Sequence, residues 1–307
     1  MQISSLVTGG SGFIGSHLVD ALVHRGDRVV VVDWVEPTAD RRNSKAEYIL
    51  CDIRDRKLEH IVANAAPNIV FHLAAHIDDR ASVLDPIMNA EHNELGSINV
   101  FASAFAAKVQ SIVFASSCAV YGMPESVPVS EFARCRPRTP YGISKFAAET
   151  YLDSYALCDD IHTVSLRFAN VYGPRQYGNT EAGAIAIFTE KLLRGESPFL
   201  NGDGSTTRDY VFVHDVVAAL IAASASAVSG VYNVGTGREI PTKALYEMIA
   251  GEIATDIRPT PRPEVKDAVM RMSLDITAIR EAMFWRPTVE LEEGIRETIA
   301  WYRKFLA

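Results

Sequence analysis

The stretch LVTGGSGFIG, residues 6–15, decides the fold of this chain. It overlaps an apolar, β-branched start at residues 3–8 and runs into an amphipathic helical pattern. Gly9, Gly12 and Gly15 stand where a side chain would block the tight turn, the approach of backbone to a pyrophosphate, or the packing of helix on strand. The helix N-terminus that follows offers unpaired N–H groups to phosphate. We therefore expect a strand, a phosphate-binding turn and a helix rather than an ordinary glycine loop.

An acidic residue ends the next predicted strand, residues 28–33. Asp33 stands roughly 20 residues beyond the last glycine, the separation typical of dinucleotide sites. A carboxylate there accepts hydrogen bonds from the adenosine ribose and repels a 2′-phosphate, which predicts NAD rather than NADP. Asp52 is either an adenine contact or a plain turn residue. Arg41 and Arg42 are expected as solvated loop charges, and the alternative is a contact with a 2′-phosphate.

Strand and helix patterns continue to alternate through the first half of the chain. Further β-branched runs occupy residues 69–74, 112–116 and 164–169. Such continuous apolar runs, separated by helical patterns, predict an α/β fold with a doubly wound parallel sheet. Beyond residue 173 the elements become shorter, so we expect a Rossmann domain over 1–173 and a smaller substrate-binding lobe over 174–307. Strand-like runs at 210–213 and 231–234 are expected to return to the main sheet, within a segment of about 209–237.

The composition argues against several classes of function. The formal net charge of −8 disfavours nucleic acid as a partner. The four cysteines form no CxxC pair and have no His at zinc-finger spacing, so we expect a reduced protein without a metal site. The uncharged stretch 216–237 contains serine, glycine and asparagine, which favours a buried helix and a strand over a membrane span. Residues 1–9 lack the features of a secretory signal, and we expect a cytoplasmic protein.

A candidate catalytic group follows one of the predicted strands. Thr139 suits the cap of a helix in which Tyr141 and Lys145 lie one turn apart on the same face. The strand that ends just before Ser117 delivers it to the carboxyl end of the sheet, where open α/β sheets bind ligands. We expect Tyr141 to transfer the proton, Ser117 to hold the reacting hydroxyl, and Lys145, with the charge of the cofactor, to lower the tyrosine pKa. A tyrosine four residues before a lysine also occurs by chance. The catalytic interpretation therefore depends on Ser117 being predicted at the same end of the sheet.

Several motifs together resemble the extended short-chain dehydrogenases. They are TGGSGFIG at residues 8–15, HLAA at 72–75, SSCAVYG at 116–122 and YGISK at 141–145. LRFANVYGPRQ at 166–176, GDGSTTRDYVFVHDV at 202–216 and the closing FWRPTVELEEGIRETIAWY look like the branch that contains the UDP-glucose 4-epimerases. The resemblance implies a UDP-sugar substrate and a tightly held NAD that takes hydride from carbon 4 of the hexose. It also implies that Tyr141 takes the hydroxyl proton.

The resemblance assigns further residues. It implies substrate contacts at Asn170, Arg208, Arg262 and Met272, in addition to Ser117 and Tyr141. The cofactor contacts that we expect, besides the glycines, Asp33 and Asp52, are Phe13, Ile14, Ile53, Leu73, Ala74, Ala75, Asn93, Ser116, Tyr141, Lys145 and Phe168. Met272 would lie beside the sugar's 2-substituent, and the alternative is a plain core residue. A homodimer built from helices at 85–109 and 141–157 is also implied.

Other reactions of the same scaffold are the alternatives. Dehydratases and UDP-glucuronate decarboxylases of this family carry acidic residues where this chain has Cys118 and Ala119, so epimerisation is favoured. A 4-ketoreductase would need an exchangeable cofactor, and a non-catalytic NAD-binding protein would be expected to lose a catalytic residue. Cys118 is expected to be a buried, inert thiol. The acidic pair Asp78 and Asp79 either shapes substrate choice or forms a solvated turn that caps the next helix.

Overall fold

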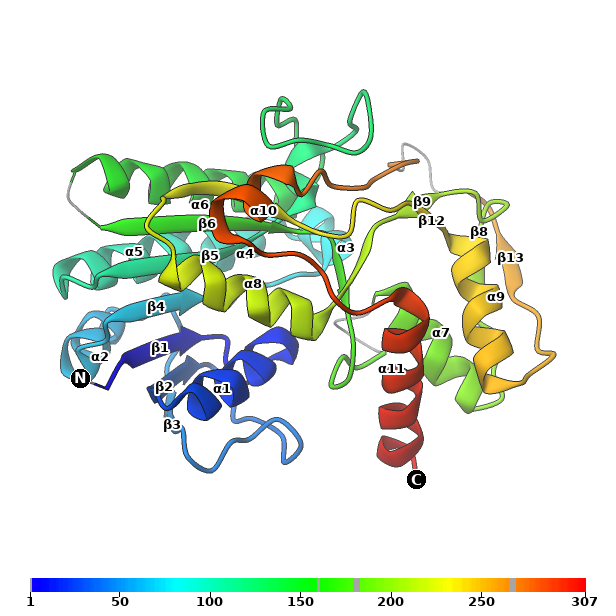
Figure 1. Ribbon diagram of the computed structural model, residues 1–307, viewed down its shortest axis with the longest axis horizontal. Helices are drawn as coiled ribbons and strands as arrows, with labels where there is room; N and C mark the ends of the chain where they lie inside the picture. The colour runs from blue at the N-terminus through cyan, green and yellow to red at the C-terminus, as the bar shows by residue number, and fades with distance from the viewer. Residues whose placement is uncertain (1, 159–160, 179–182, 265–268) are drawn as a thin grey trace.

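A parallel sheet lies at the centre of the molecule (Figure 1). The computed structural model describes residues 2–158, 161–178, 183–264 and 269–307. The central sheet has seven strands in the order β11-β6-β5-β4-β1-β2-β3, and all neighbours are parallel. They are β1 Ser4–Thr8, β2 Arg28–Asp33, β3 Glu47–Leu50, β4 Ile69–His72, β5 Ser111–Ser117, β6 His162–Phe168 and β11 Gly230–Val234. The predicted α/β class with a parallel sheet is confirmed.

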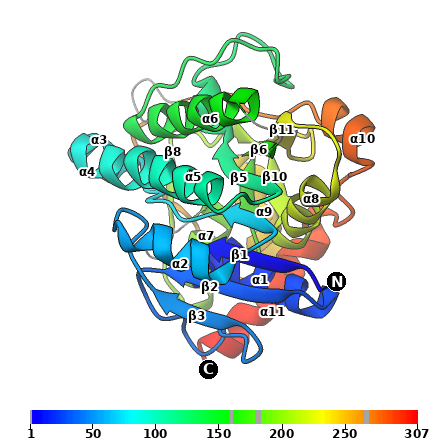
Figure 2. The ribbon, with the colours of Figure 1, turned by 90° about the vertical axis from the view of Figure 1, so that its left-hand side faces the viewer.

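Helices cover both faces of this sheet (Figure 2). One face carries α1 Phe13–Arg25, α8 Val213–Ala225 and α10 Thr277–Met283, and the other carries α2 Lys57–Ala65, α5 Gly96–Ala106 and α6 Pro140–Cys158. Successive strand residues point to opposite faces, so Val7 packs in the first layer and Leu6 in the second. Both layers are buried, which explains the continuous apolar runs in β2 and β4. Within the described ranges, no helix is long and apolar enough to cross a bilayer.

A broken helical run connects β4 to β5. α3 Asp79–Leu84 and α4 Pro86–Ala90 precede a π-helical turn, Glu91–Leu95, that leads directly into α5. Asp85, predicted as the first helical residue, instead caps α4, because its carboxylate accepts a hydrogen bond from the N–H of Met88 at 2.9 Å. The helix predicted to reach Val109 ends at Ala106, and Lys108 has a positive φ of 54°.

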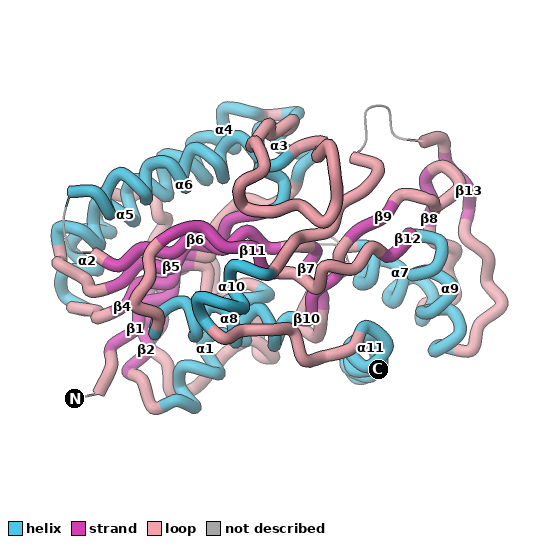
Figure 3. The backbone as a smooth tube through the Cα atoms, turned by 45° about the horizontal axis from the view of Figure 1, so that its top comes forward, coloured by secondary structure: helices cyan, strands magenta, loops and turns pink. Residues whose placement is uncertain are grey.

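Part of the chain beyond β6 builds a second, smaller region around α7 Ala184–Leu193, α9 Thr242–Ile253 and α11 Leu291–Phe305 (Figure 3). β7 Asn170–Tyr172 pairs with β10 Tyr210–Phe212, β8 Phe199–Asn201 with β13 Thr260–Arg262, and β9 Thr207–Arg208 with β12 Ile240–Pro241. A separate hydrophobic cluster that includes Phe188, Tyr246 and Ile299 forms its core. The predicted domain boundary after residue 173 falls between β7 and α7, and it stays a prediction.

One of the two segments expected to return to the main sheet does so. β11 pairs with β6 along its whole length, from Gly230 opposite Val164 to Val234 opposite Phe168. The same expectation is wrong for residues 210–213. Because β6 lies between β5 and β11, both of its edges are already paired, and β10 adds to β7 instead.

Candidate active site

The glycine turn between β1 and α1 forms a backbone cradle. Gly9 has a positive φ of 73°, and its N–H donates to the carbonyl of Val32 at 3.0 Å. A Cβ on Gly15 would lie 2.1 Å from the Gly9 carbonyl oxygen, and a Cβ on Gly9 would lie 2.6 Å from the backbone nitrogen of Ala74. Neither position can hold a side chain without moving the backbone. α1 begins at Phe13, directly after this turn, so its first residues line the cavity beside the cradle.

Asp33 and Arg41 line the same cavity. The Asp33 carboxylate accepts a hydrogen bond from the N–H of Ser11 at 3.0 Å. Burial raises the pKa of Asp33 above its usual value, and the Ser11 hydrogen bond opposes that rise. Arg41 is 6% exposed and donates to the backbone carbonyls of Ser11 and Arg175. The expectation of a solvated loop charge is therefore wrong for Arg41, whereas Arg42 is exposed as expected.

The cavity beside the glycine turn lies along the carboxyl ends of the strands from β1 to β6. We call it the cofactor cavity. The predicted cofactor residues that line it are Gly9, Gly12, Phe13, Ile14, Gly15, Asp33, Asp52, Ile53, Leu73, Ala74, Ala75, Ser116, Tyr141, Lys145 and Phe168. Asp52 also forms a turn and pairs with the guanidinium of Arg54 at 2.7 Å. Asn93 is not among the lining residues. It is buried, and its amide bonds both the N–H and the carbonyl of His76, at 2.7 and 2.8 Å, so it holds the backbone of the cavity wall.

The structure brings Ser117, Tyr141 and Lys145 together. β5 ends at Ser117, and Tyr141 lies in the first turn of α6, where the Thr139 hydroxyl accepts a hydrogen bond from the N–H of Gly142 at 3.2 Å. Lys145 lines the cofactor cavity, Ser117 lines a second cavity, and Tyr141 lines both. The three side chains therefore stand at the boundary between two cavities.

Burial dominates the acid–base properties of this group. The Lys145 amine donates to the carbonyl of Ala115 at 2.7 Å, and burial lowers its pKa to about 7 while Glu149 acts in the opposite direction. Burial raises the pKa of Tyr141 above its usual value, and a hydrogen bond with Ser117 opposes part of that rise. The protein alone does not supply the lowered tyrosine pKa that is expected from Lys145. A cation bound beside Tyr141 would act in the required direction.

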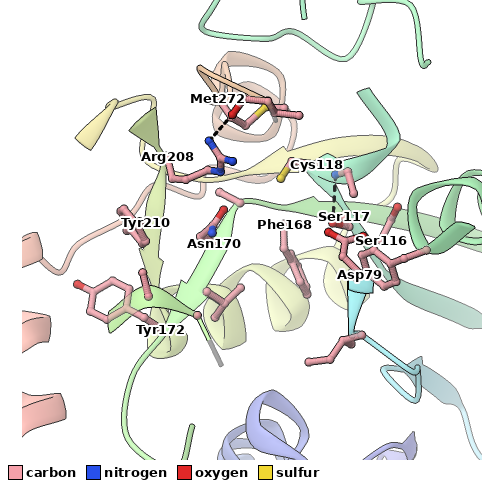
Figure 4. Close-up of a pocket in the computed structure, with 18 of the residues that line it drawn as sticks. Asp79, Ser116, Ser117, Cys118, Phe168, Asn170, Tyr172, Arg208, Tyr210 and Met272 are labelled. Atoms are coloured by element: carbon pink, nitrogen blue, oxygen red, sulfur yellow. Dashed lines mark hydrogen bonds between the residues drawn. The ribbon is translucent and has the colours of Figure 1, made fainter. Parts of the chain in front are cut away.

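Figure 4 shows the second cavity, whose lining also includes Tyr141. Of the residues predicted to contact substrate, Ser117, Tyr141, Asn170, Arg208 and Met272 line it. The Arg208 guanidinium donates to the carbonyls of Thr207 and Val269, at 2.7 and 2.8 Å, which fixes one end of its fork. Met272 is buried, with 4% of its surface exposed. We call this space the substrate cavity.

Arg262, also predicted to contact substrate, lies elsewhere. It is exposed on β13, where its guanidinium carbon lies 3.2 Å from the centre of the Phe199 ring. This cation–π contact holds the side chain on the small sheet formed by β8 and β13. The described residues that line the substrate cavity do not include Arg262, so its assignment as a phosphate contact stays a prediction. Residues 265–268, shortly after β13, lie outside the described residues.

The two members of the acidic pair follow the two alternatives stated for them, and several other lining residues are absent from the sequence prediction. Asp78 caps α3, accepting hydrogen bonds from the N–H groups of Arg80 and Ala81 at 2.8 and 3.0 Å. Asp79 instead lines the substrate cavity, and the Thr139 hydroxyl donates to its carboxylate at 2.8 Å. Other residues missed are Trp34 and His76 in the cofactor cavity, and Arg138, Tyr172 and Tyr210 in the substrate cavity. The signal for Asp79 is an acidic pair so soon after the HLAA motif.

The cysteines carry no chemistry at this site. Cys118 is half-buried in the wall of the substrate cavity, and burial raises its pKa to about 11, which leaves an unreactive thiol. Among the described residues, no group of three or more His, Cys, Asp or Glu side chains could hold a metal ion. The side chain of Cys158 lies outside the described residues.

A Rossmann sheet whose cofactor cavity shares a tyrosine with a substrate cavity, beside a serine and a lysine, defines an enzyme of the short-chain dehydrogenase class. The chain belongs to the NAD dependent epimerase/dehydratase family, whose model matches residues 5–235. It is 42% identical over 307 residues to the UDP-glucose 4-epimerase of Mycolicibacterium smegmatis, a match that covers 97% of this chain and 98% of that one.

Solved structures of related enzymes share the whole fold. The UDP-glucose 4-epimerase of Thermotoga maritima, solved with UDP-glucose, is 39% identical with a TM-score of 0.96, over 99% of this chain and 100% of that one. The UDP-glucose 4-epimerase of Thermus thermophilus, solved with NAD, is 37% identical with a TM-score of 0.93, over 98% of this chain and 99% of that one.

Proposed function

We propose that this chain is an NAD-dependent UDP-hexose 4-epimerase that interconverts UDP-glucose and UDP-galactose. The observation that carries the proposal is the wall shared by the two cavities. Tyr141 stands on it, with Lys145 on the cofactor side and Ser117 on the substrate side. A sugar hydroxyl at this boundary meets a proton acceptor and faces the cofactor at the same time. Similarity to UDP-glucose 4-epimerases along nearly the full length supports the same substrate class.

The cofactor cavity fits a dinucleotide. NAD, when bound, supplies the hydride acceptor for carbon 4 of the hexose. The cradle suits a pyrophosphate, because Gly9 and Gly15 leave no side chain between backbone and ligand. The Asp33 carboxylate would accept hydrogen bonds from the adenosine ribose and repel a 2′-phosphate. Lys145 would bind the nicotinamide ribose.

The residues of the substrate cavity would carry the proton chemistry and hold the nucleotide sugar. Ser117 would hold the 4-hydroxyl while Tyr141 removes its proton; with the carbon 4 hydride passed to the cofactor, a 4-keto sugar is left. Once this sugar has rotated to present its other face, the hydride would return to carbon 4 and Tyr141 would return the proton, so that the other epimer forms. Arg208 would bind the diphosphate through its planar donors, and Asn170 would bind the sugar or the diphosphate.

The direct test is turnover of UDP-galactose by the purified protein without added NAD. We expect NAD to be released on denaturation, and UDP-glucose to form without exchange of the carbon 4 hydrogen with solvent. A protein isolated without cofactor and active only with NADPH would contradict the proposal and favour a ketoreductase. A product without its 6-hydroxyl would identify a dehydratase, and release of CO₂ from UDP-glucuronate would identify a decarboxylase. Bound NAD with no turnover would leave a non-catalytic NAD-binding protein.

We further propose that the chain forms a homodimer through the helices between Asp85 and Ala106 and through α6. Both present exposed apolar side chains: Ile87 is 72% exposed and Leu157 is 83% exposed. Light scattering at micromolar concentration should give twice the chain mass, and Ile87→Arg should give a monomer. Phe132→Arg is the matched control, because Phe132 is 96% exposed and belongs to neither of these helices. A monomeric wild type would contradict the proposal.

We also place the protein in the cytoplasm. Cys51, Cys118 and Cys135 are free cysteines, which suits a reducing compartment. Fractionation of cells that express the chain would test the location, and recovery from a secreted or membrane fraction would contradict it.

A further inference from the structure

Asp79 brings a carboxylate to the substrate cavity that Ser117 and Tyr141 also line. It begins α3, and its carboxylate accepts a hydrogen bond from the Thr139 hydroxyl at 2.8 Å. The same hydroxyl accepts from the N–H of Gly142 at 3.2 Å, so Asp79 is fixed to the helix start that carries Tyr141. Figure 4 shows Asp79 beside Ser117, on the wall of the cavity.

The charge of this carboxylate acts on the reacting groups. Burial raises the pKa of Asp79, while the Thr139 hydroxyl and the positive charge of Arg208 oppose that rise. Asp79 in turn contributes to raising the pKa values of Tyr141 and Cys118, for which burial is the larger cause. Its field therefore reaches the part of the cavity where the proton transfer would take place.

Positively charged side chains also line the cavity. The arginines and Asp79 would contact different parts of a nucleotide sugar. Arg208 and Arg138 line it and suit the diphosphate of a nucleotide sugar. Asp79 lies instead near Ser117 and Tyr141, where the hexose ring would react. A neutral hexose can donate a hydroxyl hydrogen bond to a carboxylate there. A hexuronate would place a second carboxylate in the same partly enclosed space, where like charges repel with little screening.

We propose that Asp79 makes this site selective for neutral UDP-hexoses against UDP-hexuronates. The inference rests on the proposed function, because it takes the hexose to occupy the cavity beside Ser117 and Tyr141. Asp79 acts through its charge on the sugar, and it takes no part in the hydride or proton transfer.

The test compares UDP-glucose with UDP-glucuronate in the wild type and in Asp79→Asn, which keeps the size of the side chain and removes its charge. For each protein, kcat/KM and Kd are measured for both sugars. We expect the uronate-to-hexose ratio to rise by at least about tenfold in Asp79→Asn. Asp203→Asn is the matched control: Asp203 is exposed on a turn, where its carboxylate accepts from the N–H of Ser205 at 2.8 Å, and it does not line the described cavity. Its ratio should match that of the wild type within about twofold.

An unchanged ratio in Asp79→Asn would overturn the inference, as would an equal rise in Asp203→Asn. Should Asp79→Asn lose turnover, the ratio of the two Kd values, measured by calorimetry on the NAD-bound protein, decides in the same way. The wild type's activity on UDP-glucose tests the proposed function separately. A wild type that binds both sugars but epimerises neither would contradict that function, while the Kd ratio would still test Asp79.

Discussion

The cofactor cavity and the substrate cavity are built by different means. The first is shaped by backbone at the ends of parallel strands, where Gly9 and Gly15 cannot carry a side chain. The second is assembled from single side chains on short strands and loops, such as Arg208 on β9 and Met272 before α10. A site made by backbone fails as a whole when one residue changes, whereas a site made by side chains can be retuned one residue at a time.

Gly15→Ala should break the cofactor side most severely. A Cβ at 2.1 Å from the Gly9 carbonyl oxygen forces the cradle open, so we expect loss of bound NAD, loss of turnover and a destabilisation of about 3 kcal/mol. The measurements are the absorbance of released NAD and the free energy of unfolding. Gly251→Ala on α9 is the control, because its Cβ would meet nothing within 4 Å and the protein should keep its NAD. Normal NAD content in Gly15→Ala would show that the cradle is not the phosphate site.

Tyr141→Phe sharpens the comparison at the wall that the two cavities share. The ring stays and the proton acceptor is lost, so turnover should fall by at least ~10²-fold with NAD still bound. Steady-state rates and NAD content report the two effects separately. Tyr151→Phe, on the same helix and 43% exposed, should retain its activity. Near-normal turnover in Tyr141→Phe would remove this residue from the mechanism.

Arg208→Ala and Arg262→Ala separate the arginine that lines the substrate cavity from the arginine that does not. Removing Arg208 should weaken UDP-sugar binding by about 10- to 100-fold, the usual cost of losing hydrogen bonds to a charged group, and leave NAD content unchanged. Removing Arg262, which stacks on Phe199, should change Kd by less than about twofold. Calorimetry with UDP-glucose measures both. An equal loss in the two variants would mean that β13 approaches the cavity when substrate binds.

Met272→Tyr should have the smallest effect, confined to sugar choice. Met272 lines the substrate cavity, and its flexible thioether can move aside at low cost for a 2-acetamido group. We expect UDP-glucose turnover as the main activity, detectable turnover of UDP-N-acetylhexosamines, and a several-fold fall in the N-acetyl activity relative to the hexose activity in the variant. The measurement is the ratio of kcat/KM for the UDP-N-acetylhexosamine to kcat/KM for UDP-glucose, in the wild type and in the variant. An unchanged ratio would assign Met272 to the core alone.

The cofactor side is predictable from sequence because its signals are local. A strand, three glycines and a helix follow one another without interruption, and continuous apolar runs mark strands that are buried on both faces. Asn93 shows the limit of this reasoning. It is predicted to contact the cofactor, but whether an amide faces a cavity or its own backbone depends on the π-helical turn that carries it, and no local pattern signals that turn.

On the substrate side, contacts between segments far apart in the sequence decide where the residues lie. The sequence alone could not predict these contacts. β10 is predicted in the main sheet, because nothing in residues 210–213 shows that β6 has both edges occupied. The family resemblance assigns Arg262 to the substrate, while its position depends on β13 pairing with β8 and on the ring of Phe199. Asp79 and Thr139 are far apart in sequence, and only the fold brings them into hydrogen-bonding distance.

Two contacts join the cofactor side to the segment that follows β7. The His17 ring nitrogen lies 2.8 Å from the carbonyl oxygen of Pro174, and Arg41, on the cofactor cavity wall, donates to the carbonyl of Arg175 at 2.5 Å. An epimerase regenerates its cofactor in every catalytic cycle, so it gains from a long residence time and loses nothing by slow exchange. These two contacts would help the protein to hold its cofactor for a long time. We expect that loosening them would raise the dissociation rate of NAD, so that the cofactor would exchange more readily with the cellular pool.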